Sequence, residues 1–579
     1  SITNNGALVL DNDSSAMFSQ TISGSGTLTK NGSGSLQMLG GLNTFSGLTT
    51  IAEGTLEVMT TNAMGSTAAG TVVQSGATLW LKNHYNAAEP LTLNGTGDGG
   101  AGALRTSSGY NVSYAGPITA ATDATISVTD SLTLTGGLVK DGTVLTLAGG
   151  GTFNINTTGI SGSSPNSDLV VDGSTVNLNV ASTYNGPTYV QNGGTLNANV
   201  TGALPTSPRS AIHLDPGLSS GSTLALGASQ VVEFVSGVIS SSIALGSHDL
   251  TVGSTSPSNA PFAGVISGTG GIVKDGTNGW TLTGTSNTYS GSTTLAGGTL
   301  GIHGDGSLGA YPLTPTNKIF FTGNATLQDA GNHVTLGANR GISIASGVTG
   351  TFDATGNTFT IDSVISGSGA ATFAGFALSN SVLNGSNTYD GITTVTGAAT
   401  LHANVNNALG TAAAGTIVNS GAALLLNSVA YTTAEALTIN GSGGLNGGAL
   451  VSSGTSSYAG LITAATHSTI QNSGTLTLTG GLVKDGTTLT LAGNGTYNIN
   501  SIGISGSSPN SDLVVDGAIV SLNAASSYNG PTYVQNGGTL NANVTGAMPT
   551  SPRSAVHLDI TGSGGSMLSL GASQEVELV

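Results

Sequence analysis

The chain has 579 residues, of which 92 are Gly and none is Cys, and its 10 Lys and Arg stand against 27 Asp and Glu. A formal net charge of −17 with singly scattered cations argues against nucleic acid and anionic membrane surfaces as partners, since both attract clustered Lys and Arg. No run approaches the roughly 18 to 20 apolar residues of a membrane-spanning helix, so no membrane-spanning segment is expected. The lack of Cys is compatible with an exported protein that needs no disulfides.

The first residues, SITNNGALVLDND, contain no basic segment followed by an apolar run, as a signal peptide would. The last residues, GASQEVELV, resemble GASQVVEFV at 227–235, where the pattern continues into SGVISSS. We therefore predict that residues 1–40 continue from coils further upstream, and that the pattern continues downstream of the last residue.

A short cassette recurs along the chain. It consists of ISGxG, an alternation of apolar and polar residues, and then NTYxGxTxxxxGTL, and it begins at Ile22, Ile266 and, in a degenerate copy, Ile365. Its aromatic position is occupied by Phe45, Tyr184, Tyr289, Tyr389 and Tyr528. The unequal intervals indicate that whole coils have been inserted between cassettes, which stacked repeats tolerate.

A longer repeat is superimposed on the cassettes. The segment YNGPTYVQNGGTLNANVTGA occurs unchanged at Tyr184–Ala203 and at Tyr528–Ala547. Extending this match predicts one solenoid copy at 41–235 and a second at 385–579, with intervening coils at 236–384.

Short strands are predicted throughout. In SLTLTGGLVKDGTVLTLAGGGTFNIN, residues 131–156, apolar side chains alternate with Thr, Ser or Asn at the period of a half-buried strand. Asp or Asn followed by Gly predicts turns at Asn31-Gly32, Lys140–Gly142, Lys274–Gly276 and Lys484–Gly486. A β-sandwich or propeller would need closed units of domain size, whereas the unequal intervals favour coils stacked along an axis.

The predicted fold is therefore all-β: a parallel β-helix, or β-solenoid, forming an elongated rod. Its coils should take roughly 20 to 25 residues each, within the range of known repeats. Inward Val, Leu, Ile and Ala should stack on like residues, and Gly should form the corners. Asn side chains can stack in ladders within the turns, for which Asn192 and Asn536 are the candidates.

The fullest cassette, ISGTGGIVKDGTNGWTLTGTSNTYSGSTTLAGGTLGI at Ile266–Ile302, resembles the passenger-associated transport repeat, also called the autotransporter-associated β-strand repeat. A Lys-x-Gly turn, an LTLTG-type strand, the NTYxG step and a GTL strand follow one another in that family's order. The resemblance implies a right-handed β-helical passenger of the giant surface adhesin type. It also implies export by a Gram-negative bacterium and display at the outer-membrane surface.

Carboxylates are the candidate catalytic groups, because polysaccharide-acting β-helices bring two or three acids to one face. The closest pairs are Asp11 with Asp13, Asp168 with Asp172, and the repeat of the latter at Asp512 with Asp516. We interpret all of them as solvated turn residues. Calcium would take oxygen ligands from the same residues, yet neither an EF-hand loop nor a tandem calcium-binding nonapeptide occurs. No catalytic, cofactor-binding or metal site is predicted.

Histidine and aromatic residues receive the same structural interpretation. The His residues lie far apart in sequence, for example His84, His213, His303 and His557. Exposed aromatic rings can stack on sugars, but the recurring NTY tyrosines are predicted to pack at a coil corner, and Trp80 and Trp280 are the only tryptophans. Asn-x-Ser/Thr sequons, which a suitable host could glycosylate, include Asn94, Asn111, Asn199 and Asn543.

The function predicted is that of a non-enzymatic extracellular surface protein, an adhesin or a stalk or coat built from repeats, that mediates attachment or aggregation. The alternative is a self-assembling subunit of an extracellular filament, sheath or surface layer. A polysaccharide-acting β-helix enzyme is the third hypothesis. The expected partners are a second copy of the chain, associated end to end or laterally, or glycans and proteins on host or neighbouring cells.

Overall fold

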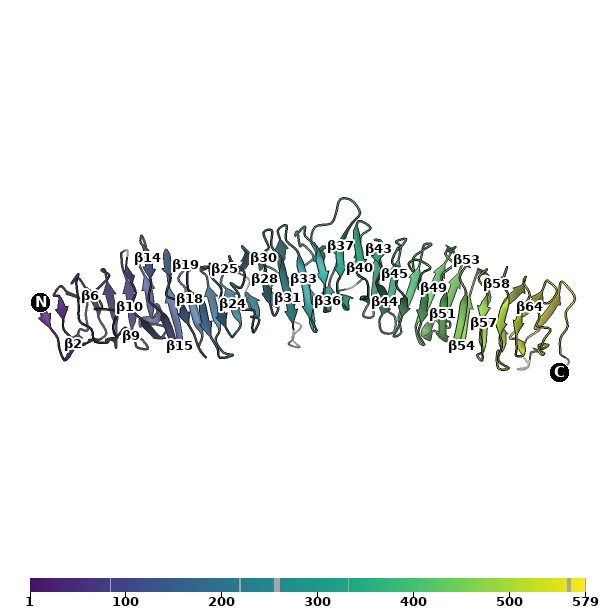
Figure 1. Ribbon diagram of the computed structural model, residues 1–579, viewed down its shortest axis with the longest axis horizontal. Helices are drawn as coiled ribbons and strands as arrows, with labels where there is room; N and C mark the ends of the chain where they lie inside the picture. Colours follow the sequence, from purple (N-terminus) through teal and green to yellow (C-terminus); the bar gives the residue numbers. More distant parts are fainter. Residues whose placement is uncertain (84, 218–219, 255–260, 332, 560–563, 578–579) are drawn as a thin grey trace. The chain divides into compact units, whose positions relative to one another are not determined.

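In the computed structural model, the regular secondary structure is almost entirely short β-strands (Figure 1), as predicted. The helices described are three short 3-10 turns, η1 (Asp98–Gly100), η2 (Asp305–Leu308) and η3 (Gly444–Asn446). In the described part of the chain, no helix has the length and apolar character that a membrane crossing requires. The structure describes all residues except 84, 218–219, 255–260, 332, 560–563 and 578–579.

The chain divides into two compact units, Ser1–Gly291 and Ser292–Val579. Each unit is a stack of coils whose neighbouring strands pair in parallel, which confirms the predicted parallel β-solenoid. In unit 1, strand pairing runs on through residue 40, where β6 (Ser35–Met38) pairs with β8 (Thr55–Val58). The boundaries proposed from the long repeat therefore do not interrupt the stack in that unit, and they remain a prediction.

One face of unit 1 shows how successive coils add strands. Its described residues form a parallel sheet of nine strands in which each strand comes from a different coil. The strands, in order, are β11 (Asn86–Ala87), β14 (Asn111–Tyr114), β16 (Ser131–Leu134), β19 (Thr152–Ile155), β22 (Thr175–Leu178), β25 (Thr195–Ala198), β27 (Thr223–Leu226), β30 (Ser242–Ala244) and β32 (Val265–Ser267).

Unit 2 contains an equivalent face. Its described part is a parallel sheet of seven strands in the same kind of sequential order. These strands are β50 (Ala430–Tyr431), β53 (Thr455–Tyr458), β55 (Thr475–Leu478), β58 (Thr496–Ile499), β61 (Ile519–Leu522), β64 (Thr539–Ala542) and β66 (Met567–Leu570).

Each regular coil contributes three strands. In unit 1, one coil is formed by β20 (Ile160–Gly162), β21 (Leu169–Asp172) and β22, and the next by β23 (Thr183–Tyr184), β24 (Thr188–Gln191) and β25. Along one column, Asn177 follows Asn154 by 23 residues and Asn197 follows Asn177 by 20. The predicted coil length of about 20 to 25 residues is confirmed for these coils.

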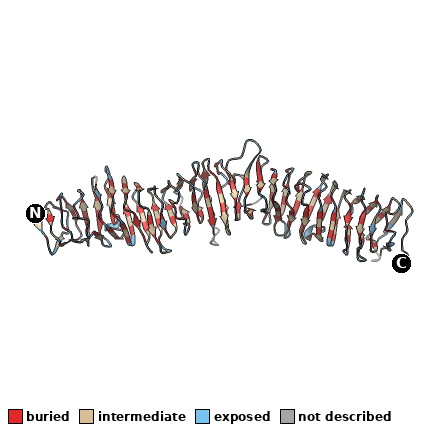
Figure 2. Ribbon diagram, viewed as in Figure 1, coloured by how far each residue is buried: buried red, intermediate tan, exposed pale blue. Residues whose placement is uncertain are grey.

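Alternating burial explains why this sequence forms strands. In β19, Phe153 and Ile155 are fully buried, while Thr152 and Asn154 point outward and are half-buried. Phe153 is paired with Val176 on the next coil, and Val176 is paired in turn with Leu196 on the coil after that. Figure 2 shows the same alternation of buried and partly exposed residues along the strands. Each inward Val, Leu, Ile or Phe stabilises the stack by roughly 1.5 to 3 kcal/mol relative to exposure.

The NTY step of the cassette has a specific hydrogen-bonding role. The Asn43 side chain accepts a hydrogen bond from the Ile22 backbone N–H at 2.7 Å and donates to the Ala63 carbonyl at 2.7 Å, and so joins three coils. Asn387 does the same, accepting from the Ile365 N–H at 2.8 Å. The ISG and NTY parts of the motif are therefore coupled because one side chain satisfies buried backbone groups of its neighbours.

Candidate functional site

The aromatic residues of the cassette lie in the core. Phe45, Tyr184, Tyr289, Tyr389 and Tyr528 are each at most 1% exposed. The hydroxyls of the tyrosines are bonded internally, with Tyr184 Oη 2.6 Å from Thr188 Oγ1 and Tyr528 Oη 2.7 Å from Thr532 Oγ1. The predicted packing role is confirmed, and these rings present no face to a sugar.

The lysines of the predicted Lys-x-Gly turns point into the solenoid. The glycines adopt the expected positive φ, 71° for Gly142 and 69° for Gly486. The lysine side chains, on which the turn prediction made no statement, are at most 1% exposed; they are Lys30, Lys140, Lys274 and Lys484. The ammonium of Lys140 lies 4.1 Å from the centre of the Tyr184 ring, two coils further along the stack.

A glycine on the intervening coil makes room for this contact. Gly162 occupies the coil between Lys140 and Tyr184, and a Cβ at this position would lie 2.2 Å from the Lys140 carbonyl oxygen. The second copy repeats the arrangement, with Lys484 4.0 Å from the Tyr528 ring. Burial lowers the pKa of both Lys140 and Lys484 to about 7, although Asp168 and Asp512 respectively raise it. The sequence pattern did not distinguish an inward lysine from a turn lysine.

Asparagine ladders are present, but not where they were predicted. Asn192 and Asn536 are exposed at the turns, and each donates to an aspartate of the preceding coil, Asp172 or Asp516. The prediction for these two residues is therefore wrong. The reason is that a ladder requires Asn in register with Asn, whereas the amide of each of these two residues bonds to an aspartate of the preceding coil that is itself in register with a glutamine.

The ladders lie on the outer surface of the sheet described above. In unit 1, the Asn177 amide donates to Asn154 at 2.8 Å, and Asn197 donates to Asn177 at 2.6 Å. A second ladder runs beside it through Asn156, Asn179 and Asn199, and unit 2 repeats that ladder through Asn500, Asn523 and Asn543. Each amide uses one N–H and one lone pair within the ladder, so the remaining donor and acceptor capacity can face a ligand.

The predicted acidic pairs have structural partners. Asp13 accepts a hydrogen bond from the Ser33 backbone N–H at 3.3 Å, and Asp172 accepts from Asn192. Burial raises the pKa of Asp168, and the neighbouring Lys140 lowers it. Across the described residues, no group of three or more His, Cys, Asp or Glu is placed to hold a metal ion.

Two of the histidines are stacked on tyrosines. His213 in β26 (Ile212–Leu214) lies 4.9 Å from the Tyr189 ring centre, and His557 in β65 (Val556–Leu558) repeats this distance to Tyr533. Burial lowers the pKa of His213. His303 is exposed after β36 (Gly298–Ile302), and His84 lies outside the described residues.

The two tryptophans are both covered. Trp280 is fully buried, and its Nε1–H donates to the Val235 carbonyl at 2.8 Å. Trp80 in β10 (Thr78–Leu81) points outward, but the cationic groups of Lys82 and Arg105 each lie 3.9 Å from the ring centroid. Cations on its face stabilise the ring and compete with a sugar for it.

The sequons differ in how accessible their asparagines are. The Asn94 side chain donates to the Val73 carbonyl at 2.9 Å, whereas Asn111 is exposed, and Asn199 and Asn543 are exposed members of the ladders. Glycosylation at these positions remains a prediction.

Two buried glutamates were not predicted from the sequence. Glu89 is 3% and Glu435 0% exposed, and burial raises the pKa of each to about 7 although hydrogen bonds from threonine lower it. Each follows a tyrosine by four residues, and that tyrosine, Tyr85 or Tyr431, stacks on a tyrosine of the next coil. The shared Tyr-x-x-x-Glu spacing in the two copies was the signal that could have found them.

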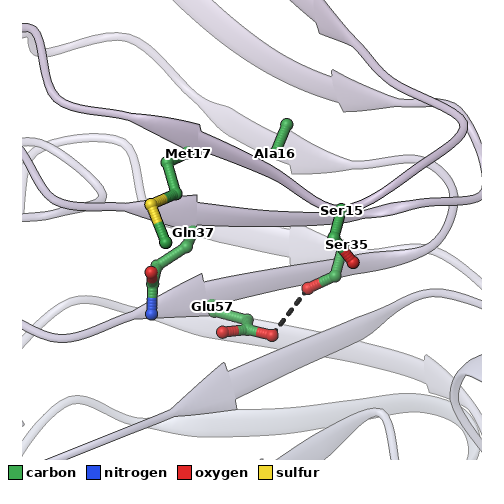
Figure 3. Close-up of a pocket in the computed structure, with 6 residues that line it drawn as sticks. All are labelled: Ser15, Ala16, Met17, Ser35, Gln37 and Glu57. Atoms are coloured by element: carbon green, nitrogen blue, oxygen red, sulfur yellow. Dashed lines mark hydrogen bonds between the residues drawn. The ribbon is translucent and has the colours of Figure 1, made fainter.

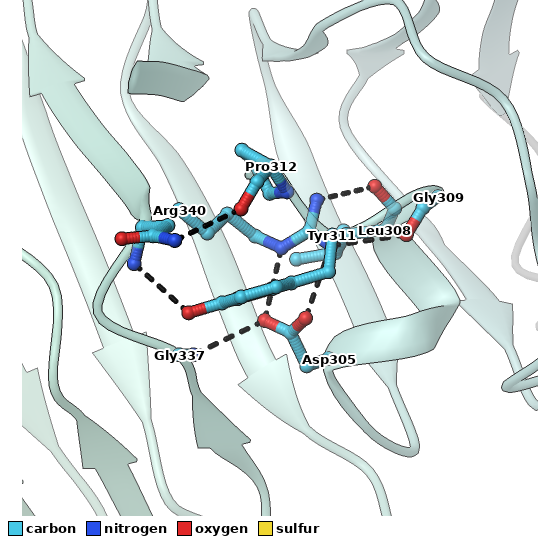
Figure 4. Close-up of polar contacts among 8 residues, drawn as sticks. Asp305, Leu308, Gly309, Tyr311, Pro312, Gly337 and Arg340 are labelled. Carbon is cyan, nitrogen blue, oxygen red and sulfur yellow. Dashed lines mark hydrogen bonds and ion pairs between the residues drawn. The ribbon is translucent and has the colours of Figure 1, made fainter. Parts of the chain in front are cut away.

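Unit 2 also contains an anchored loop between β36 and β37 (Thr316–Phe321), which was not predicted from the sequence (Figure 4). Arg340 is 1% exposed and forms a two-pronged ion pair with Asp305, at 2.9 and 3.0 Å, while also donating to the Leu308 and Gly309 carbonyls. The Asn339 N–H donates to the Tyr311 hydroxyl at 3.0 Å. These bonds hold the loop against β40 (Arg340–Ile344).

An open hollow of about 380 Å³ lies near the first coils of unit 1 (Figure 3). Glu57 is the only titratable residue among those that line it, and its carboxylate accepts from Ser35 Oγ at 2.7 Å and pairs with Lys82. A hydrolytic site needs a second acid or base beside the first. The hollow therefore does not resemble the catalytic cleft of a polysaccharide-acting β-helix.

Comparison with known proteins agrees with this description. The family model named passenger-associated-transport-repeat matches residues 28–58, 272–302, 382–403 and 517–542. The Adhesin BmaC autotransporter of Brucella suis biovar 1 (strain 1330) is 30% identical over 533 residues, which are 88% of this chain and 13% of that protein. The chain thus spans about an eighth of the length of this relative. No solved structure matches the chain. The resemblance predicted from the cassette is confirmed: the chain is a parallel β-solenoid with passenger-associated transport repeats, and most of it is similar to part of an autotransporter adhesin.

Proposed function

We propose that the chain is a stretch of an exported autotransporter passenger, displayed at the outer-membrane surface of a bacterium, that attaches the cell to other surfaces without catalysis. The observation that carries the proposal is the similarity of 88% of the chain to part of an autotransporter adhesin. Because the chain spans only 13% of that relative, the activity of the whole protein does not transfer by similarity alone.

The surface chemistry supports attachment by many weak polar contacts. Outward columns consist of hydroxyls and amides, such as Thr152, Thr175 and Thr195 beside the Asn154 ladder, and successive coils repeat them in register. A periodic array of neutral donors and acceptors can bind a repeating polar partner through several coils at once, and simultaneous contacts multiply affinity. The acids predicted from the sequence bond to turns, which supports a non-enzymatic role.

Self-assembly is a second candidate, favoured by an exposed residue of the anchored loop. Leu313 is 96% exposed in the segment that follows Tyr311, although Arg340 holds the loop in place. An apolar side chain displayed on a fixed loop is suited to an apolar pocket on a second copy, and such a contact between unlike surfaces can propagate. Sedimentation velocity of the purified chain and of Leu313→Ser tests it: a loss of oligomers in the variant supports it, and a monomeric wild-type chain excludes it.

Attachment is tested by displaying the chain on a non-adherent bacterium, fused to the transport domain of an unrelated autotransporter. The matched control displays an unrelated β-solenoid of similar length and charge. We expect several-fold more displayed cells to bind cultured epithelial cells or other bacteria than in the control. Equal attachment at equal surface expression would refute the proposal.

A further inference from the structure

A polar pocket of about 320 Å³ opens on the surface of unit 1 beside β11. Its rim consists of exposed residues, including Asn62, Thr67 and Asn86, and Glu89 forms its buried floor. This volume lies at the lower end of the range of about 300 to 1,000 Å³ that is usual for small-molecule sites. The pocket therefore suits a ligand of about one sugar ring in size.

The carboxylate at the floor is only partly satisfied by the protein. Glu89 Oε1 accepts a hydrogen bond from Thr71 Oγ1 at 2.7 Å. Within the described part of the chain, Glu89 Oε2 has no hydrogen-bond donor, and the buried hydroxyl of Tyr85 has no partner. At pH 8, above its pKa of about 7, Glu89 is mostly ionised. An ionised carboxylate has about four lone-pair sites, so Glu89 then keeps acceptor capacity for a group that enters from the pocket.

The second copy provides an internal comparison. There, Glu435 Oε1 accepts from Thr416 Oγ1 at 2.6 Å, and Oε2 accepts from the Tyr431 hydroxyl at 2.9 Å. Both oxygens are thus satisfied by the chain itself. The tyrosine equivalent to Tyr431 is Tyr85, because each precedes its glutamate by four residues and stacks on a tyrosine that bonds to the carbonyl of that glutamate.

The segments above the glutamate also differ between the copies. In unit 2, Asn406 Oδ1 accepts from the backbone N–H groups of Thr432 and Thr433, at 2.8 and 3.2 Å, and so bridges the two segments that correspond to the walls of the pocket. In unit 1, the residue equivalent to Asn406 is Thr61, which lines the open pocket. The same fold therefore closes over one acid and leaves the other facing solvent-accessible space.

We propose that the pocket of unit 1 binds one pyranose residue of a glycan, with sugar hydroxyls donating to Glu89 and the amides of Asn62 and Asn86 bonding to the neighbouring hydroxyls. This inference deepens the proposed adhesive function and rests on it. A sugar fits because it supplies several hydroxyl donors and acceptors to a lining of hydroxyl, amide and carboxylate groups.

The test uses the purified full chain, immobilised on a sensor at pH 8, where Glu89 is mostly ionised. Serum albumin conjugated with galactose, glucose, mannose or N-acetylglucosamine provides four separate probes. We expect at least one conjugate to bind. Glu89→Gln should weaken that binding about tenfold or more, since hydrogen bonds to charged groups are the stronger ones. The matched variant Glu435→Gln, at the closed site, should leave binding unchanged.

A second variant covers the case in which Glu89→Gln fails to fold. Asn62→Ala changes only the exposed rim and should weaken binding about threefold to tenfold, as the loss of a neutral hydrogen bond does. The inference is overturned if none of the four conjugates binds, if Asn62→Ala and a folded Glu89→Gln bind as wild type, or if Glu435→Gln is equally impaired. Displayed cells that still attach while no conjugate binds would reject this pocket and leave the adhesive function standing, whereas loss of both would reject both.

Discussion

Replacing Glu435 by Gln should remove a large part of the pH dependence of the stability of unit 2. Burial raises the pKa of this carboxyl from its ordinary value of 4.5 to about 7. A carboxyl whose pKa is raised in the folded state gives stability that is fully present below pH 4.5 and is lost as the pH rises through about 7. The difference between the two values corresponds to roughly 3 kcal/mol, because one pKa unit is worth about 1.4 kcal/mol.

The variant keeps the shape of the side chain but has no proton to lose. Gln can still accept from Thr416 Oγ1 and can face the Tyr431 hydroxyl, which is able to accept as well as donate. The free energy of unfolding of wild type relative to Glu435→Gln should therefore fall by roughly 3 kcal/mol between pH 4.5 and pH 8. Guanidinium unfolding followed by far-ultraviolet circular dichroism measures this difference at each pH.

Glu575→Gln is the control, because Glu575 is exposed and pairs with the exposed Arg553. A surface pair of this kind contributes about 0 to 1 kcal/mol to stability. The difference in the free energy of unfolding between wild type and Glu575→Gln should therefore be nearly the same at pH 4.5 and pH 8. If the difference between wild type and Glu435→Gln is the same at pH 4.5 and pH 8, the assignment of a buried, proton-binding carboxyl is wrong.

Three further changes probe the buried contacts. Arg340→Ala should destabilise unit 2 by about 3 to 5 kcal/mol and expose residues 309–315 to proteolysis. The control Arg553→Ala should cost at most about 1 kcal/mol. Limited proteolysis and unfolding midpoints measure both effects. Burial lowers the pKa of Lys484 to about 7, so the stability that the neutral lysine gives is lost as the pH falls through that value. The free energy of unfolding of Lys484→Met relative to wild type should therefore rise as the pH falls from 10 to 6 in the same titrations. Gly162→Ala should destabilise unit 1 by about 1 to 3 kcal/mol through its contact with a backbone carbonyl, whereas Gly41→Ala, which meets nothing within 4 Å, should change the melting temperature little.

Much of the fold could be predicted because its signals are local. Alternation with a period of two fixed which residues of β19 face inward, and glycine after aspartate fixed the positive φ at Gly142. The recurring tyrosine of the NTY step indicated packing, and Tyr184 is buried. Each of these conclusions needs only the few residues around it.

The rest depends on register between coils, which the sequence pattern does not give. Asn192 is a ladder candidate from the sequence, yet its side chain bonds to Asp172, while Asn177 lies between Asn154 and Asn197. Similarly, Lys140 points inward because Gly162 leaves space above it. The number of residues per coil varies, and this number decides which side chains of neighbouring coils meet. Side-chain ladders and the contacts of buried lysines therefore could not be deduced from spacing alone.

The candidate pocket required a comparison of the two copies in three dimensions. Glu89 and Glu435 occur in similar sequences, and neither lies in a known binding motif. Only the structure shows that Tyr431 satisfies one acid while Tyr85 leaves the other with spare acceptor capacity. This difference, and not the presence of an acid, distinguishes the open site from the closed one.

The most direct test of the central claim, that the chain is a stack of parallel coils in register, is disulfide trapping across two neighbouring coils. The chain has no cysteine of its own, and Thr175 and Thr195 are paired partners on adjacent outward strands. Paired strands lie about 4.8 Å apart, within the reach of a disulfide, whereas Thr175 and Asn197 are separated by about 8 Å along the diagonal. We expect rapid oxidation of the Thr175→Cys/Thr195→Cys variant and little oxidation of the Thr175→Cys/Asn197→Cys variant. Equal oxidation of the two, or preference for the diagonal pair, would contradict the register on which the ladders, the buried lysines and the pocket all depend.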